Sequence, residues 1–188
     1  VLVDAAEDAL DDALDIVGAD TTLSEIGGAI EDAVTSHDVR PVTNLSGHGL
    51  ARFDAHTPPT VPNVTNGNQN TIGDDTAIAI EPFTTDGAGE VYEGEDATVF
   101  EQVGEGNARN QMVRKVLKQI ESYEGLPFAT RWIADEHGWA KTRYALRELH
   151  RLDIVKGYPP LKERRDGNVA QAEHTVVIAD GDVHITTK

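Results

Sequence analysis

The sequence contains no cysteine and only one methionine among its 188 residues. Disulfide bonds, thiolate metal sites and cysteine nucleophiles are therefore excluded, and any bound metal must be held by histidine, aspartate or glutamate. No apolar run approaches the ~18–20 residues that a membrane span needs, and no charged start followed by an apolar stretch indicates a signal peptide. These absences predict a soluble, cytoplasmic protein.

Basic residues are also scarce, with 16 Lys and Arg against 33 Asp and Glu, a formal net charge of −17. This excludes nucleic-acid binding over the whole surface, because phosphate binding depends on Lys and Arg. Thirteen of the 16 bases nevertheless lie in residues 106–165, against seven acids, so this segment differs in charge from its surroundings. We interpret the remaining acidic surface as that of a halophile's protein, because high salt screens its self-repulsion.

The first part of the chain has the periodicity of two amphipathic helices. Apolar residues recur over residues 2–17, starting at Val3, and Asp and Glu fill the other face. A second helix begins at Thr22, where Thr22 and Glu25 form a capping box. Since the only methionine is Met112 and Val1 leads directly into the first helix, we expect this sequence to be the later part of a longer protein.

Short strands and loops follow over residues 41–75. Residues 76–83 (TAIAIEPF) then read as one buried strand, with Glu81 on the face of Ala77 and Ala79. Near the end of the chain, residues 169–179 predict another strand, and a turn at Asp180-Gly181 joins it to residues 183–187 in a hairpin.

Between these β segments the pattern becomes helical. We expect helices from Met112 to Ile120, around residues 128–134, and over about 139–152, the last burying Tyr144, Leu149 and Leu152. Three short helices, then Ile154-Val155 and a basic turn, are typical of a winged-helix unit. The sequence thus predicts an α+β fold in which residues 106–157 form an inserted helical subdomain whose two ends lie close together.

Three polar residues are candidate metal ligands. Glu81 and Glu173 each fall within an apolar strand, where an ionised carboxylate is costly unless it is paired or metal-bound. His48 lies between Gly47 and Gly49, which allow backbone and ligand to approach closely. His174 points to the opposite face from Glu173, which favours a packing role. On spacing alone, ordinary solvated or hydrogen-bonded roles remain open for all of them.

Several ordered motifs together resemble the type-2 methionine aminopeptidases of archaea and eukaryotes. Two of them surround histidines, two surround glutamates, one begins with Tyr158, and one resembles the family's helical insertion. The segments are NLSGHGL (44–50), ARFDAH (51–56) with Val61-Pro62-Asn63, AIAIEPFTTDGAGEV (77–91), LPFATRWI (126–133), YPPLKE (158–163) and VAQAEHTVVI (169–178).

The resemblance implies a pita-bread-type fold, in which helices cover an antiparallel sheet, formed here by residues 1–105 and 158–188. It also implies two divalent ions per complete site, of Co, Mn, Fe or Zn. The implied ligands are His48, Glu81 and Glu173, with Glu173 as a bridge.

The implied activity is removal of N-terminal methionine from nascent proteins by hydrolysis with a metal-activated water. His56 and Glu81 would be the catalytic residues, with His56 contacting the substrate carbonyl and Glu81 moving a proton. Tyr158 and, less directly, Pro127 would line the methionine pocket. Nascent chains are the implied partners, with the ribosome as a further candidate, no specific DNA binding, and a monomeric state.

The sequence also departs from this family. The family's two aspartate ligands and a second substrate-contacting histidine lie upstream of the helix at residues 2–17 and have no counterpart here. Asp4, Asp8, Asp11 and Asp12 lie on the exposed face of that helix and do not replace them. We therefore expect weak binding of a single ion, little activity of this chain alone, and recovery of methionine release when an upstream segment is supplied.

A binding module is the alternative interpretation. In it, the basic helical segment contacts nucleic acid or the ribosome, and the rest of the chain is a scaffold. The Lys and Arg residues are, however, spread over helix faces without interleaved aromatic or glycine residues.

Overall fold

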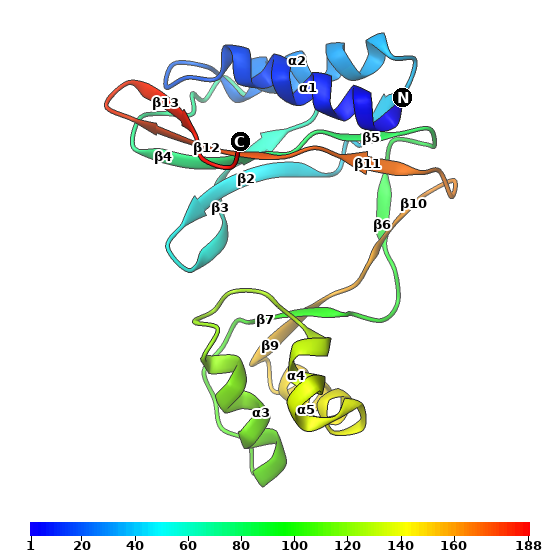
Figure 1. Ribbon diagram of the computed structural model, residues 1–188, viewed down its shortest axis with the longest axis vertical. Helices are drawn as coiled ribbons and strands as arrows, with labels where there is room; N and C mark the ends of the chain where they lie inside the picture. Colours follow the sequence, from blue (N-terminus) through cyan, green and yellow to red (C-terminus); the bar gives the residue numbers. More distant parts are fainter. The chain divides into compact units, whose positions relative to one another are not determined.

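The computed structural model describes residues 1–188 and divides into two compact units (Figure 1). Unit 1 comprises Val1–Arg52, His56–Tyr92 and Lys162–Lys188, and unit 2 comprises Phe53–Ala55 and Glu93–Leu161. Strands β6 (Val91–Glu93) and β10 (Leu161–Glu163), where the chain leaves unit 1 and returns to it, pair with each other. No helix combines the length and apolarity needed to span a bilayer.

Two helices cover one face of the main sheet of unit 1 (Figure 1). Helix α1 (Leu2–Ile16) packs on helix α2 (Leu23–Ser36) through small residues, among them Ala6, Ala9 and Ala13, which are fully buried. The predicted capping box is confirmed, since Thr22 and Glu25 each accept the other's backbone N–H. Val3 was expected on the buried stripe but is 56% exposed, because it lies in the first turn, where the buried face begins only at Ala5.

The main sheet has five strands in the order β13-β12-β4-β2-β3. Their bounds are Asp182–Ile185, His174–Ala179, Thr76–Ile80, Ser46–Ala51 and Asp54–Pro62. Apolar residues on alternate positions of β4 and β12 form one core with the inner face of α2; this core includes Ile26, Ile30, Val34, Ile78, Ile80, Val176 and Ile178. The opposite face of this sheet carries the candidate ligands.

A second sheet adjoins the first, because the two chain segments that form β4 and β12 each contribute another strand to it. It has the order β1-β5-β11, formed by Arg40–Pro41, Phe83–Thr85 and Val169–Gln171. The predicted single strands over 76–83 and 169–179 are therefore wrong: each is interrupted, between Ile80 and Phe83 and between Gln171 and His174. Pro82 has no N–H to donate, and its carbonyl accepts the N–H of Ala172 at 3.2 Å.

Unit 2 is a small α/β unit with its own core. Its helices are α3 (Gln111–Glu121), α4 (Thr130–His137) and α5 (Trp139–Arg151), and its sheet has the order β8-β7-β9. These strands are Phe128–Ala129, Val99–Gln102 and Val155–Tyr158, and both pairs are antiparallel. Phe128 thus begins a strand instead of a helix. The winged-helix likeness of this unit and the insertion bounds 106–157 stay predictions.

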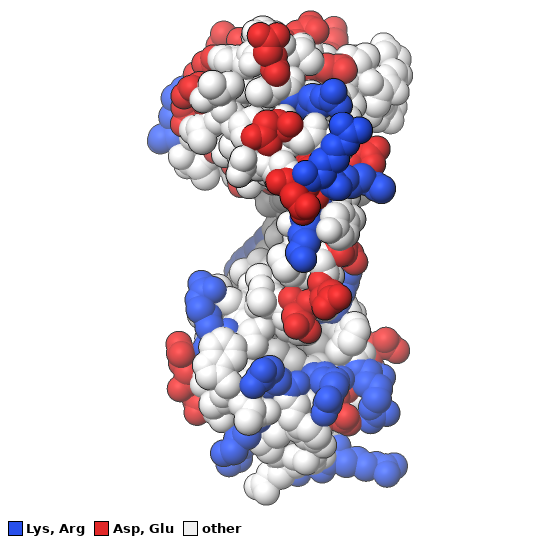
Figure 2. All heavy atoms as spheres, turned by 90° about the vertical axis from the view of Figure 1, so that its right-hand side faces the viewer, with Lys and Arg blue, Asp and Glu red and all other residues white.

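The prediction for the buried face of α5 was partly wrong. Leu149 is buried as expected, but Tyr144 is 38% exposed and Leu152 is 41% exposed. The buried residues of α5 are Thr142, Ala145, Leu146 and Leu149. Tyr144 lies two positions from both Thr142 and Leu146 and therefore points away from their stripe, and Leu152 follows the last helical residue. Lys and Arg side chains gather on the helical part of unit 2 in the view of Figure 2.

Candidate metal site

Glu81 and Glu173 lie opposite each other at the junction of the two sheets of unit 1. On one side of the interruptions Ile80 pairs with His174, and on the other side Phe83 pairs with Gln171. The antiparallel register is therefore unbroken and places residue 81 opposite residue 173. Like charges directly opposite one another destabilise a sheet, so this pair of carboxylates requires a compensating group.

Gln171 supplies part of that compensation. Its amide Nε2 donates to Glu81 Oε2 at 2.8 Å and to Glu173 Oε2 at 3.3 Å, and thus stands between the two carboxylates. Sequence reasoning missed this residue. The sequence Gln171-Ala172-Glu173 could have indicated it, because residues two positions apart share a face of an extended chain, so the Gln171 amide lies on the same side as the Glu173 carboxylate.

His48 approaches the carboxylates from the neighbouring strand β2, where it pairs with Ala79 of β4. Its Nε2 lies 3.0 Å from Glu81 Oε1, and its Nδ1 lies 3.1 Å from the Gly49 carbonyl oxygen. A carbonyl oxygen only accepts, so Nδ1 carries a proton and donates it, and Nε2 faces the carboxylate. A backbone carbonyl on Nδ1 is the usual partner that orients a metal-binding histidine.

Glycine allows this approach of the strands. A Cβ placed on Gly47 would lie 2.1 Å from the carbonyl oxygen of Ala79, so no larger residue fits without moving β2 away from β4. The prediction that the glycine beside His48 permits close approach is therefore supported by the geometry.

His56 joins the group from β3. Its ring centroid is 4.4 Å from that of His48, with the two ring planes tilted by 56°. The structure thus brings together His48, His56, Glu81 and Glu173, the four residues of unit 1 that the sequence selected. Their roles as ligands and substrate contacts stay predictions.

Burial raises the pKa of Glu81, and the nearby charge of Glu173 raises it further, whereas His48 lowers it. The site therefore carries more negative charge than its own cations balance, which favours a bound cation.

The donor set fits a divalent ion. One imidazole nitrogen and two carboxylates are ligands that Mn, Fe, Co and Zn all accept. His48, Glu81 and Glu173 would hold such an ion, and His48 Nε2 and Glu81 Oε1 lie 3.0 Å apart. No three of the histidine and acidic side chains converge tightly enough to enclose an ion, and the Gln171 amide donates to both carboxylates.

Tyr158 and Pro127 belong to unit 2, where the Tyr158 hydroxyl donates to the Glu101 carboxylate and Pro127 directly precedes β8. Burial, followed by this hydrogen bond, raises the pKa of Tyr158 to about 12. His174 Nδ1 lies 3.0 Å from Thr187 Oγ1, and the packing role expected of His174 stays a prediction.

The acidic residues of α1 are exposed, as the sequence predicted. Asp4 pairs with the amino group of Val1 at 2.8 Å, and Asp8 pairs with His37 at 2.8 Å. Neither contributes to the group around Glu81.

Comparison with known proteins relates the whole chain to one enzyme family. Residues 1–180 match the model of metallopeptidase family M24. The chain is 38% identical over 188 residues to a methionine aminopeptidase of Archaeoglobus fulgidus and 38% identical over 188 residues to one of Methanocaldococcus jannaschii. Each match covers 100% of this chain and 63% of the relative, so the chain spans less than two thirds of these proteins.

Solved structures show the same fold. A thermophilic Arx1 matches 98% of this chain and 56% of its own with a TM-score of 0.82 at 14% identity. Methionine aminopeptidase of Thermotoga maritima matches 100% of this chain and 51% of its own with a TM-score of 0.61 at 18% identity. The predicted fold, an antiparallel sheet covered by helices, is thereby confirmed.

Proposed function

The chain belongs to metallopeptidase family M24, and from this premise we propose that it is the part of a methionine aminopeptidase that holds a divalent ion and contacts the scissile bond. The names of the curated relatives support the reaction, and their 38% identity over the full length of this chain supports a shared site. The proposed substrates are new proteins that begin with methionine.

One observation carries the proposal. Glu81 and Glu173 lie opposite each other where the two sheets of unit 1 meet, and His48 of the neighbouring strand β2 lies 3.0 Å from Glu81. His48, Glu81 and Glu173 would hold the ion. A divalent ion bound there supplies a Lewis acid, which polarises the substrate carbonyl and acidifies water.

The residues of this chain then perform the proton transfers. Glu81, whose Oε1 lies 3.0 Å from His48 Nε2, takes a proton from the attacking water as the carbon–oxygen bond forms. It passes that proton to the leaving nitrogen as the carbon–nitrogen bond breaks, which yields free methionine and a shortened peptide. His56, beside His48, donates a hydrogen bond to the substrate carbonyl oxygen. Tyr158 and Pro127 would line the pocket for the methionine side chain.

A chimera tests this proposal. In it, this chain replaces the matching region of the Archaeoglobus fulgidus relative, and release of methionine from Met-Ala-Ser is measured with Mn²⁺ in high salt. We expect turnover in the chimera and a loss of ~10²-fold or more in kcat in its His56→Ala and Glu81→Gln variants, the scale expected of acid–base and oxyanion groups.

The matched controls are Glu7→Gln in α1 and His37→Ala at the residue after α2, which change the same residue types outside the site. Tyr158→Ala should relax the preference for methionine over leucine at the first position. Full turnover in the Glu81→Gln chimera would contradict the assigned proton transfer, and unchanged selectivity would remove Tyr158 from the pocket.

A further inference from the structure

Three arginines of unit 2 have no acidic partner. Arg131 lies in the first turn of α4, and Arg143 and Arg147 lie one turn apart on α5. None of the three guanidinium groups forms an ion pair or hydrogen bond, whereas Arg151 at the end of α5 pairs with Glu148 at 3.0 Å. Like charges four positions apart on a helix repel each other. An anion bound between the arginines would remove this repulsion.

The same three arginines line a hollow of about 850 Å³. Trp139, His150 and Phe100 also line it, and Trp139 is 56% exposed. On α5 the lining positions 139, 143, 147 and 150 fall on one face, because they are spaced by three or four residues. Cations and an exposed aromatic ring are therefore presented together on one helix face.

The hollow also has an acidic side. Glu95 and Asp96, in the segment before β7, line it without forming an ion pair with any of the arginines. The lining thus offers guanidinium donors, a flat aromatic surface and carboxylate acceptors. These groups match the three parts of a nucleotide, namely the phosphate, the base and the ribose hydroxyls.

We infer that this hollow binds a nucleotide, with its phosphate on Arg143 and Arg147 and its base stacked on Trp139. The volume lies within the ~300–1,000 Å³ of small-molecule sites. A free nucleotide and a nucleotide of single-stranded RNA share this chemistry.

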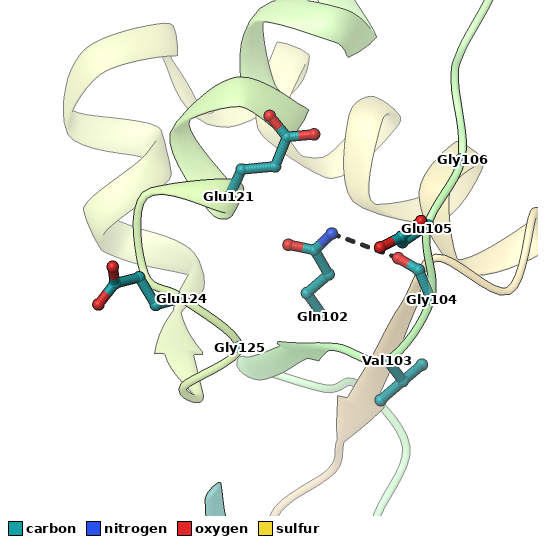
Figure 3. A pocket seen from close by; sticks show the side chains of 8 residues that line it. All are labelled: Gln102, Val103, Gly104, Glu105, Gly106, Glu121, Glu124 and Gly125. Atoms are coloured by element: carbon teal, nitrogen blue, oxygen red, sulfur yellow. Dashed lines mark hydrogen bonds between the residues drawn. The ribbon is translucent and has the colours of Figure 1, made fainter. Parts of the chain in front are cut away.

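Charge distinguishes this hollow from another one in unit 2. That hollow, of about 700 Å³, is lined by Glu105, Glu121 and Glu124 and by no basic residue (Figure 3). It would repel a phosphate. Within unit 2 the arginine-lined hollow is therefore the place for an anionic ligand.

Fluorescence quenching tests the inference directly. The chain has two tryptophans, so in a Trp132→Phe background the emission reports on Trp139 alone. AMP, ATP and a ten-residue oligoadenylate are titrated separately, with inorganic phosphate and a hexaglutamate peptide as further probes. We expect saturable quenching by adenine-containing probes. Quenching by AMP and ATP indicates a free nucleotide, quenching by the oligonucleotide alone indicates an RNA strand, and either supports the site.

Charge-matched variants separate specific binding from general attraction. Arg143→Gln with Arg147→Gln should weaken binding ~10-fold or more, because charge-assisted contacts are lost. Lys115→Gln with Lys118→Gln, which removes the same charge from exposed positions on α3, should change it less than ~2-fold. Circular dichroism checks folding, and Arg147→Lys keeps the charge while removing the planar fork, so it should also weaken binding.

Three results would overturn the inference. They are the absence of quenching by every adenine-containing probe at millimolar concentration, equal losses in the two double variants, and binding of hexaglutamate or phosphate as tight as that of AMP.

Discussion

Gly47→Ala tests whether the close approach of β2 and β4 positions His48. The added Cβ would lie 2.1 Å from the Ala79 carbonyl oxygen, 3.1 Å from its carbon and 3.3 Å from the Glu81 nitrogen. All three atoms belong to the backbone and cannot rotate away, so the strands themselves must separate.

The magnitude follows from these distances. An ordinary contact begins near 3.4 Å, so relieving the 2.1 Å approach requires a displacement of about 1.3 Å. Such a shift breaks the ladder bonds around the pairs His48–Ala79 and Gly49–Ile78. Lost hydrogen bonds cost ~1 kcal/mol each and overpacking costs ~1–3 kcal/mol, a total of ~2–5 kcal/mol. For a chain of this size that total corresponds to a fall in Tm of ~5–15 °C.

The assay combines thermal unfolding with calorimetric titration of Mn²⁺. We expect Gly47→Ala to lower Tm by this amount and to weaken Mn²⁺ binding, because Nε2 of His48 moves away from Glu81. Gly18→Ala is the matched control, since its Cβ would meet only Thr21 Oγ1 at 3.6 Å. A Gly47→Ala chain with unchanged Tm and unchanged Mn²⁺ affinity would refute the argument.

Three further predictions concern glutamates and their partners. The pKa of Glu81 is raised from 4.5, so Glu81 binds a proton more tightly in the folded chain than in the unfolded chain. The metal-free chain therefore loses stability as pH rises above about 4.5. Glu81→Gln should raise the midpoint of urea unfolding at pH 7, and this gain should vanish near pH 4. Burial raises the pKa of Glu163, but N–H donors including Ala88 and Gly167 lower it more. Its stabilising effect is therefore present above pH 4.5 and lost on acidification, and Glu163→Gln should lower Tm at pH 7 but not at low pH. Gln171→Leu removes the donor between the carboxylates and should cost ~1 kcal/mol in urea unfolding, whereas Gln69→Leu, at an exposed position, should cost nothing measurable.

The sequence predicted the site better than the strands that build it. The apolar runs predicted that Glu81 and Glu173 both lie in buried strands, but Glu81 is half-buried and Glu173 is exposed. Two glycines indicated that His48 lies where chains approach closely, which agrees with the close contacts at Gly47. The strand pattern, however, gave no sign that both runs break at the same level and change sheets there. That break depends on pairing between segments about 90 positions apart, as in the bond between Gln171 and Glu81, which local periodicity does not encode.

Errors in unit 2 have a similar origin. Tyr144 and Leu152 were expected inside because they are large and apolar, but both are exposed. The helix instead buries Thr142, whose hydroxyl donates to the Gly138 carbonyl at 3.0 Å. Because this hydroxyl is hydrogen-bonded within the preceding turn, Thr142 can be buried although it is polar.

Titration of Mn²⁺ into the purified chain tests the central claim, that His48, Glu81 and Glu173 hold one divalent ion. We expect ~1 ion per chain, bound weakly because this chain offers it only the three side chains of His48, Glu81 and Glu173. Binding should be lost in His48→Ala and in Glu173→Gln and retained in Glu7→Gln. Two tight sites per chain, or equal binding in His48→Ala and in the unmodified chain, would contradict it.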